Sequence, residues 1–189
     1  AQAKEIGVRV TAEASPHHLC LTDEAVRGGH AGPGLLDPNV KMNPPLRAEA
    51  DRHALIEALR SGELAAVATD HAPHSREEKD VPFEAAPFGV TGLETAFAAL
   101  FTNLVRPGVL RLETLLERMS AGPARIFGLE VPRIGVGARA NLVLVNPNAT
   151  WRVREERFRS KSANSWLLGK RMSGKVVLTV AAGRVAYEA

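Results

Sequence analysis

The sequence is poor in the residues that staple small secreted proteins or anchor proteins in membranes. Its one cysteine, Cys20, excludes a disulfide within the chain and is typical of a reducing compartment. No apolar run approaches the roughly 18 residues that a membrane-spanning helix needs. We therefore expect a cytoplasmic protein with no membrane partner, in which Cys20 is a small packing residue.

A large excess of charge of one sign is also lacking. The 24 Lys and Arg residues nearly balance the 21 Asp and Glu residues, which leaves a net charge of +3. The densest basic run, residues 152–159, contains Glu155 and Glu156, so we interpret it as a solvated face. The composition therefore predicts no nucleic-acid partner.

The chain is too short for a complete (β/α)8 barrel. It has 189 residues, whereas such a barrel typically takes about 250. Its apolar share of 45% is enough for a packed core. The length therefore fits one ordinary domain or a part of a larger fold.

The first part of the sequence has the order of elements found in βα-barrels. Residues 8–13 have strand character, residues 39–42 are expected to be short and extended, and residues 47–61 have a helical pattern that Gly62 ends. A second strand is expected over residues 64–69. This strand–loop–helix–strand order predicts an α/β fold with parallel strands.

The pattern of the sequence changes from helical to strand-like near residue 130. Before it we expect a long irregular loop over residues 71–92 and amphipathic helices over residues 93–105 and around residues 112–119. After it the pattern predicts strands, with residues 181–183 forming a hairpin turn. We therefore assign residues 1–129 to a barrel part and residues 130–189 to a separate β-rich part.

The most informative segment is residues 68–74, Ala-Thr-Asp-His-Ala-Pro-His. It follows the apolar run predicted to be a buried strand, and parallel barrels keep their chemistry at the carboxyl ends of their strands. Asp70 would lie on that rim, able to bind a metal or move a proton. His74, four residues later, would lie in the loop and face a substrate.

Motifs in four places resemble the dihydroorotases, the zinc amidohydrolases of pyrimidine synthesis. The matching segments are residues 15–19 (Ser-Pro-His-His-Leu), 41–47 (Lys-Met-Asn-Pro-Pro-Leu-Arg), 68–74 with Lys79, and 86–95 (Ala-Pro-Phe-Gly-Val-Thr-Gly-Leu-Glu-Thr). They occur in the order found in that family. The resemblance implies the C-terminal part of a (β/α)8 metal-dependent hydrolase barrel, together with strands of a small β-sandwich domain.

The resemblance also implies roles for individual residues. Asp70 would bind one zinc, of two ions in the complete enzyme, and would shuttle a proton from the attacking water to the leaving nitrogen of dihydroorotate. Asn43 would hydrogen-bond the substrate, and His74 would contact its carboxylate. Phe88 and Gly89 would contribute backbone groups to substrate binding.

The other histidines are expected to hold no metal directly. The family's ligand histidines map upstream of this chain, so we place His17 and His18 in supporting or structural positions. His71 neighbours Asp70 and should point elsewhere on an extended backbone. We expect His30 and His53 on the surface.

The family's early His-x-His-x-Arg segment is not found in this sequence, and the chain opens on Ala rather than Met. We therefore expect the C-terminal portion of a dihydroorotase, which hydrolyses the cyclic amide of dihydroorotate reversibly to N-carbamoyl-aspartate and is inactive without its N-terminal half. Two alternatives stay open: an allantoinase or hydantoinase, and an inactive dihydroorotase-like scaffold for a transcarbamoylase. The expected partners are a small-molecule substrate and either a second copy of the chain or a transcarbamoylase.

Overall fold

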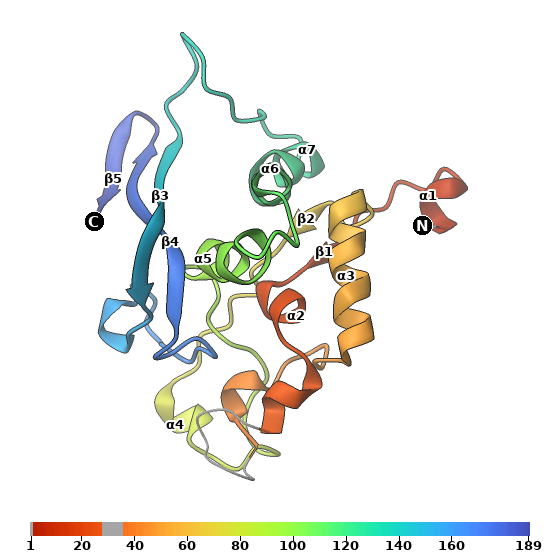
Figure 1. Cartoon of the computed structure of the whole chain (residues 1–189), viewed down its shortest axis with the longest axis vertical. Coiled ribbons are helices and arrows are strands. Elements are labelled where there is room, and N and C mark those ends of the chain that lie inside the picture. The colour runs from red at the N-terminus through yellow and green to blue at the C-terminus, as the bar shows by residue number, and fades with distance from the viewer. Residues whose placement is uncertain (1, 28–35) are drawn as a thin grey trace.

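The computed structural model describes residues 2–27 and 36–189. It places short helices around a pair of parallel strands, beside a three-stranded antiparallel sheet (Figure 1). The helices are α1 (Gln2–Glu5), α2 (Pro16–Cys20), α3 (Glu49–Ser61), α4 (Arg76–Lys79), α5 (Ala96–Leu100), α6 (Leu112–Leu116) and α7 (Gly122–Ile126). The strands are β1 (Glu13–Ala14), β2 (Ala66–Val67), β3 (Leu142–Arg152), β4 (Arg171–Ala181) and β5 (Arg184–Glu188). The 3-10 turns are η1 (Asp23–Arg27), η2 (Pro38–Val40) and η5 (Glu155–Arg157), and the π-helical turns are η3 (Phe101–Val105) and η4 (Glu117–Ala121).

The parallel pair β1–β2 is short. Glu13 lies opposite Ala66 and Ala14 opposite Val67. One backbone bond on each side, from Ala65 to Ala12 and from Ala68 to Ala14, extends the ladder. Both strands run in the same direction, so the segments that leave their carboxyl ends emerge at the same edge.

Helix α3 connects the two strands and confirms the helix predicted over residues 47–61. Acidic Glu49 and Asp51 in its first turn suit the positive end of the helix dipole. It ends at Gly62, whose φ of 92° is left-handed and whose N–H bonds to the carbonyl of Ala58. The predicted cap is therefore present.

Two expectations about local structure were wrong. Residues 8–12 form no strand, because α3 ends only at Gly62 and β2 starts after that. Among residues 8–12, only the carbonyl of Ala12 accepts a backbone hydrogen bond from the segment before β2, from the N–H of Ala65. The segment expected to be extended over residues 39–42 starts instead in the 3-10 turn η2 (Pro38–Val40), whereas Lys41 after the turn has an extended backbone, with φ −77° and ψ 104°. Asp37 caps this turn by accepting a hydrogen bond from the Asn39 N–H.

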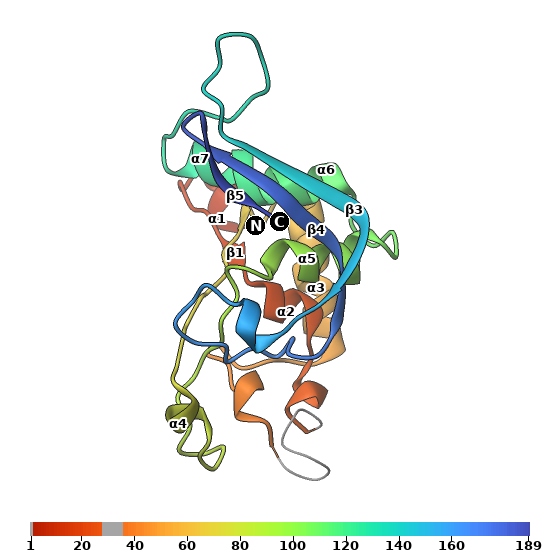
Figure 2. The same ribbon diagram turned by 90° about the vertical axis from the view of Figure 1, so that its left-hand side faces the viewer.

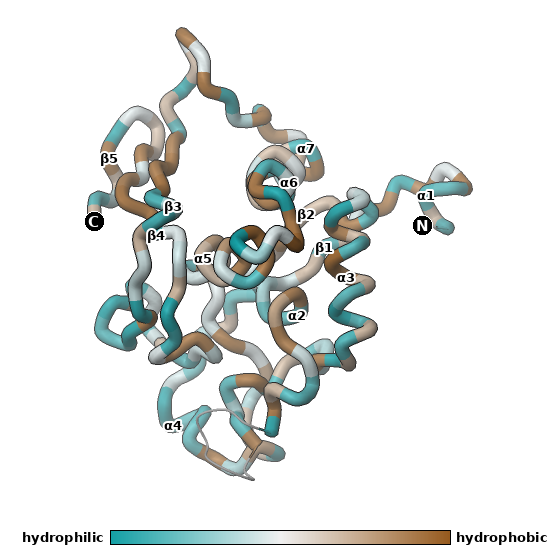
Figure 3. Tube along the Cα trace, viewed as in Figure 1, coloured by the Kyte–Doolittle hydropathy of each residue, from teal (hydrophilic) through white to brown (hydrophobic). Residues whose placement is uncertain are grey.

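The first apolar cluster fills the space between the helices and the strand pair. It includes Leu19 of α2, Leu59 of α3, Val67 of β2, Leu100 of α5 and Leu115 of α6, all buried. Figure 3 shows apolar colouring around α2, β2 and α5, and more hydrophilic colouring on much of α3. This cluster holds the strand ends in place beneath the loops.

The antiparallel sheet has the order β3–β4–β5 and crosses one side of the molecule (Figure 2). The β4–β5 turn at Ala182 and Gly183 has positive φ at both residues, as a type I′ turn requires, and confirms the predicted hairpin. Gly174 of β4 lies against α5 and η3 so closely that a Cβ there would come within 2.9 Å of Phe101. Ser173 adds a hydrogen bond from its N–H to the Thr102 hydroxyl.

The second apolar cluster joins loops of the first part to the β-rich part. It includes Met42, Val90, Val153, Trp166 and Met172. These residues come from both sides of the boundary proposed near residue 130, which stays a prediction. None of the helices formed by the described residues has both the length and the apolar character to cross a membrane.

Candidate active site

The carboxyl ends of β1 and β2 bring Asp70 and the α2 histidines together. Helix α2 begins at Pro16, directly after β1, and Asp70 lies three residues after the end of β2. The Nε2 atom of His17 is 3.7 Å from Oδ2 of Asp70. The loop of Asp70 and the helix with the histidines expected in supporting positions therefore meet at one edge of the strand pair.

Asp70 has an unusual backbone and an accessible side chain. Its φ of 49° lies in the left-handed region, which a non-glycine residue adopts at some cost and which aspartate tolerates better than most. Its side chain is 54% exposed. The carboxylate is therefore aimed by the backbone into open space, where a ligand can reach it.

His17 is buried directly behind Asp70. Burial, and to a lesser degree neighbouring His18, lower the pKa of His17 to about 3. The ring is therefore neutral near pH 7, and its contact with Asp70 is not a salt bridge. Its Nε2 atom is buried and has no hydrogen-bond partner among the described residues.

His18 ties α2 to the segment that carries Asn43. Its Nε2 lies 2.8 Å from the carbonyl oxygen of Pro44 and its Nδ1 lies 2.6 Å from the Ser15 hydroxyl. Because a carbonyl oxygen only accepts, Nε2 carries the proton and Nδ1 accepts from Ser15. His18 therefore has a structural role: it ties α2 to Pro44, the residue after exposed Asn43.

His74 and Phe88 are also brought together. The Nε2 atom of His74 donates to the Phe88 carbonyl oxygen over 2.9 Å. Its Nδ1 lies 3.7 Å from Oε2 of Glu78, and the side chain is 22% exposed. The predicted substrate-binding residues of two loops are thus in direct contact.

Gly89 must be glycine at this place. Its φ is +101°, and a Cβ would lie 2.6 Å from the Cβ of Ala72. Its N–H donates to the carbonyl of Lys41 over 2.9 Å. The Gly89 loop is therefore packed against both the Asp70–His74 loop and the segment leading to Asn43.

Two lysines anchor the loop before Phe88. Nζ of Lys41 donates to the carbonyls of Glu84 and Ala86, and Nζ of Lys79 donates to those of Pro38 and Pro87. The lysine ammonium groups thus satisfy loop carbonyls that would be paired with backbone N–H groups in a helix or a strand.

Lys79 is buried, with 6% of its surface exposed. Burial, reinforced by the nearby charge of Lys41 and opposed by Asp37 and Glu78, lowers the pKa of Lys79 to about 8. The sequence motif pointed to Lys79, but its role as a loop anchor was not predicted.

His71 points away from Asp70, as expected. Its Nδ1 accepts from the N–H groups of Gly92 and Leu93, each at 3.1 Å, so its Nε2 carries the proton. That nitrogen lies 3.3 Å from the Ser160 hydroxyl. Both ring nitrogens of His71 are therefore occupied by contacts that hold the surrounding loops together.

Of the remaining histidines, His53 is on the surface, where its Nε2 lies 3.1 Å from Oε1 of Glu49 and the side chain is 69% exposed. His30 lies outside the described residues. Cys20 packs against both apolar clusters, and burial raises the pKa of its thiol to about 12. The prediction of a packing role for Cys20 therefore agrees with its surroundings.

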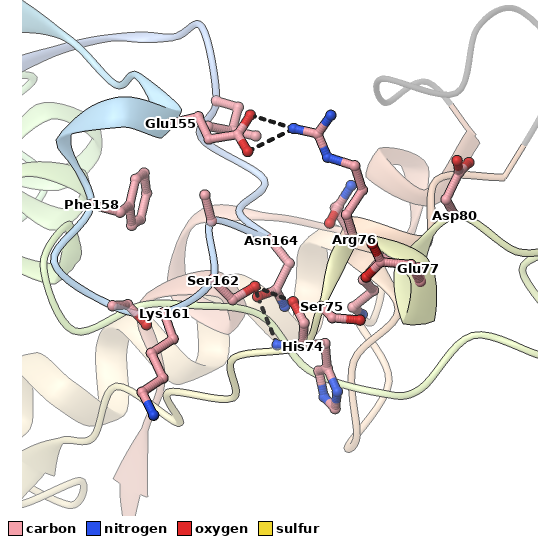
Figure 4. Close-up of a pocket in the computed structure, with 15 residues that line it drawn as sticks. His74, Ser75, Arg76, Glu77, Asp80, Glu155, Phe158, Lys161, Ser162 and Asn164 are labelled. Carbon is pink, nitrogen blue, oxygen red and sulfur yellow. Dashed lines mark hydrogen bonds and ion pairs between the residues drawn. The ribbon is translucent and has the colours of Figure 1, made fainter.

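A cavity of about 720 Å³ opens beside His74, between α4, η5 and the segment before β4. Figure 4 shows the guanidinium of Arg76 facing the carboxylate of Glu155, and Asn164 facing His74. The two Arg76–Glu155 contacts measure 2.6 and 2.8 Å. Among the predicted site residues, His74 alone lines this cavity.

The described residues supply too few ligands for a complete metal centre. In residues 2–27 and 36–189, no cluster of three or more His, Cys, Asp and Glu side chains could hold a metal ion. The exposed carboxylate of Asp70 nevertheless suits a cation beside it.

Comparison with known proteins gives a consistent family assignment. The model of a family described as "Amidohydrolase family" matches residues 33–187. The dihydroorotase of Caldanaerobacter subterraneus subsp. tengcongensis is 45% identical over 187 residues, covering 99% of this chain and 42% of the relative. The dihydroorotase of Bacillus subtilis (strain 168) is 45% identical over 186 residues, covering 98% and 42%.

Solved structures of related enzymes have the same fold. The L-hydantoinase (dihydropyrimidinase) of Arthrobacter aurescens superposes with a TM-score of 0.86 at 31% identity, covering 99% of this chain and 41% of that one. The dihydropyrimidinase of Brevibacillus agri NCHU1002 superposes with a TM-score of 0.85 at 26% identity, with the same coverage. The chain therefore spans less than half the length of the proteins that it matches.

Proposed function

Because the chain belongs to the amidohydrolase family, we propose that it forms the C-terminal part of a dihydroorotase. The reaction is the reversible hydrolysis of the cyclic amide of dihydroorotate to N-carbamoyl-aspartate, a step of pyrimidine synthesis. The observation that carries this proposal is the meeting of the Asp70 loop, the Asn43 segment and the Phe88–Gly89 loop at the strand ends. The greater sequence likeness to dihydroorotases than to hydantoinases supports it.

The proposed chemistry assigns proton transfer to Asp70. Water adds to the amide carbon of the ring, and the bond from that carbon to the ring nitrogen breaks. Asp70 accepts the proton lost by the attacking water and delivers it to the leaving nitrogen. Its exposed position allows both transfers, since the carboxylate is not committed to a salt bridge with neutral His17.

Substrate binding is assigned to the two loops and to Asn43. The Asn43 amide hydrogen-bonds the substrate, and His74 faces its carboxylate. The Nε2–H of His74 already donates to the Phe88 carbonyl, which fixes the ring beside the Phe88–Gly89 loop. Backbone groups of Phe88 and Gly89 complete the pocket.

We propose zinc as the metal, with two ions in the complete site and Asp70 as a ligand. A bound zinc lowers the pKa of water toward about 7, which makes neutral pH sufficient for hydrolysis. A catalytic zinc takes about three protein ligands, so further ligands come from residues beyond those described.

The proposed partners are the small-molecule substrate and a second copy of the protein. Neither the charge balance nor the site favours nucleic acid. A cytoplasmic location is proposed from the single cysteine, because a reducing compartment does not call for disulfides.

The test uses a full-length amidohydrolase barrel that carries these residues, assayed with and without zinc. We expect turnover of dihydroorotate, loss of turnover on chelation, and much slower hydrolysis of hydantoin and dihydrouracil. Faster hydrolysis of hydantoin or dihydrouracil would favour the hydantoinase alternative, which the solved structures support by their fold. No hydrolysis of any cyclic amide by the zinc-loaded protein would favour a scaffold.

A further inference from the structure

Residues 159–164 form a strap, which crosses two loops of the candidate site. One loop carries Asp70 and His74, and the other carries Phe88 and Gly89. The strap follows η5 and precedes β4 in the chain. At its start, the N–H groups of Arg159 and Ser160 donate to the carboxylate of Glu94. The Ser160 hydroxyl also lies 3.3 Å from Nε2 of His71. The strap therefore contacts His71 in the first loop and Glu94 just after the second loop.

The end of the strap makes the densest contacts. The side-chain oxygen of Asn164 accepts from the His74 N–H over 3.0 Å. Its side-chain nitrogen donates to the carbonyl of Ala72 over 3.0 Å and to that of Gly89 over 3.4 Å. One amide group thus bonds the loop of His74 and the loop of Gly89 at the same time.

The backbone of Asn164 adds to this connection. Its carbonyl oxygen accepts from the N–H of Thr91 over 2.9 Å and from the Thr91 hydroxyl over 3.1 Å. The Ser162 hydroxyl contacts the His74 carbonyl and lies 2.9 Å from Oδ1 of Asn164. Figure 4 shows Ser162 and Asn164 facing His74.

Asparagine suits this position better than related side chains. Asn164 is 8% exposed, so its polar atoms depend on protein partners. Its amide offers donors and an acceptor on one short planar group, and turning it over would set oxygen against two carbonyls. Aspartate would keep the bonds from His74 and Ser162 but lose both bonds that the amide nitrogen donates, and alanine would lose all four side-chain bonds.

We propose that Asn164 is a positioning residue, which fixes the His74 loop against the Gly89 loop and so sets the shape of the substrate pocket. The role in substrate binding rests on the proposed function. The clamp itself rests only on the hydrogen bonds. Asn164 touches no reacting atom in this proposal and acts through His74 and Gly89.

The test compares Asn164→Ala and Asn164→Asp with a matched control in a full-length amidohydrolase barrel that carries these residues. The control is Asn103→Asp, which also removes an amide donor from a backbone carbonyl, that of Ala99, but within a helix away from the loops. Hydrogen exchange is followed in peptides over residues 71–74, 88–92 and α3. The KM and kcat for dihydroorotate are measured in parallel.

We expect Asn164→Ala to speed exchange about tenfold at the His74 N–H and in residues 88–92, with α3 unchanged. Asn164→Asp should loosen residues 88–92 while keeping the His74 N–H protected. Both variants should raise KM about tenfold with a smaller change in kcat. Asn103→Asp should match the unmodified protein in every measurement.

Several results would overturn the proposal. Unchanged exchange in both loops would show that Asn164 does not hold them. Equal acceleration in α3 and the loops would show a general effect on stability instead of a clamp, as would a KM that stays constant in folded variants. If the unmodified barrel hydrolyses no dihydroorotate, the proposed function fails, and the exchange pattern alone still decides the clamp.

Discussion

Asp70 concentrates several properties in one residue. Its backbone is left-handed, its carboxylate is exposed, and the buried imidazole behind it is neutral and unpaired. Backbone strain of this kind clusters at functional sites. The direction of this carboxylate is thus set by the backbone and not by a salt bridge.

In a full-length barrel that carries these residues, we expect Asp70→Asn to lower kcat for dihydroorotate by about 10²–10⁴, because the amide cannot shuttle a proton. The thermal midpoint should change little, since the side chain is 54% exposed. Steady-state kinetics and thermal melting measure the two effects. Asp51→Asn, a substitution on the exposed side of α3, serves as control. A kcat equal to that of the control would remove Asp70 from the mechanism.

The buried Lys79 predicts a dependence of stability on pH. An unfolded chain keeps the Lys79 proton up to its ordinary pKa of 10.5, whereas the folded chain loses it above about 8. Between these values unfolding takes up a proton, so stability rises with pH in this window. We expect a slope of at most about 1.4 kcal/mol per pH unit from this group.

Thermal midpoints from pH 7 to pH 10 test this, with the difference between the unmodified protein and Lys79→Met as the readout. That difference should move in favour of the unmodified protein as pH rises. Lys161→Met, which removes an exposed lysine, controls for the loss of one charge. A difference that stays flat across the window would mean that Lys79 is protonated equally in both states.

At the scale of elements, sequence patterns predicted the structures that local chemistry determines. Helix α3 with its Gly62 cap and the hairpin around Gly183 were expected from local residues and were confirmed. The strand expected over residues 8–13 is limited to Glu13 and Ala14, because a strand needs a neighbour and β2 starts late. The length of β1 thus depends on where its partner strand β2 begins, and the residues of β1 alone cannot predict that.

Close packing of Gly122, at the start of α7, against the residue before β2 gives a prediction for this glycine. A Cβ on Gly122 would lie 2.5 Å from the carbonyl oxygen of Ala65 and 3.0 Å from that of Glu117. We expect Gly122→Ala to destabilise the fold by about 1–3 kcal/mol through overpacking. Chemical denaturation measures this loss. Gly135→Ala is the control, because nothing lies within 4 Å of its added Cβ, and equal stability of the two variants would contradict the packing.

At the scale of the whole molecule, the predicted fold class, part of a metal-dependent hydrolase barrel with extra β-strands, is confirmed by the likeness to hydantoinase structures. The candidate site was predicted only in part. His74, Phe88 and Gly89 belong to recognisable motifs, and the structure joins them. The anchoring by Lys41 and the clamp by Asn164 depend on contacts between distant segments, which motif spacing does not show.

The antiparallel sheet predicts how the 189-residue chain behaves alone. A cross-strand row on one face consists of Leu142, Val180 and Val185, and its outer members are 41% and 62% exposed. Apolar faces of this kind, flanked by edge strands, favour association. Size-exclusion chromatography over a range of concentrations should show species larger than a monomer. Leu142→Lys with Val185→Lys should shift them toward the monomer, and a monomeric unmodified chain would contradict this.

The Asn164 clamp has a consequence for the order in which a ribosome completes this protein. The His74 N–H finds its partner 90 residues further along the chain. At about 5–20 residues per second, residue 164 is added roughly 5–20 s after residue 74. Until then the His74 loop has been made but cannot be closed against Gly89 by this amide. The residues of the His74 and Gly89 loops are therefore translated before the side chain that joins them.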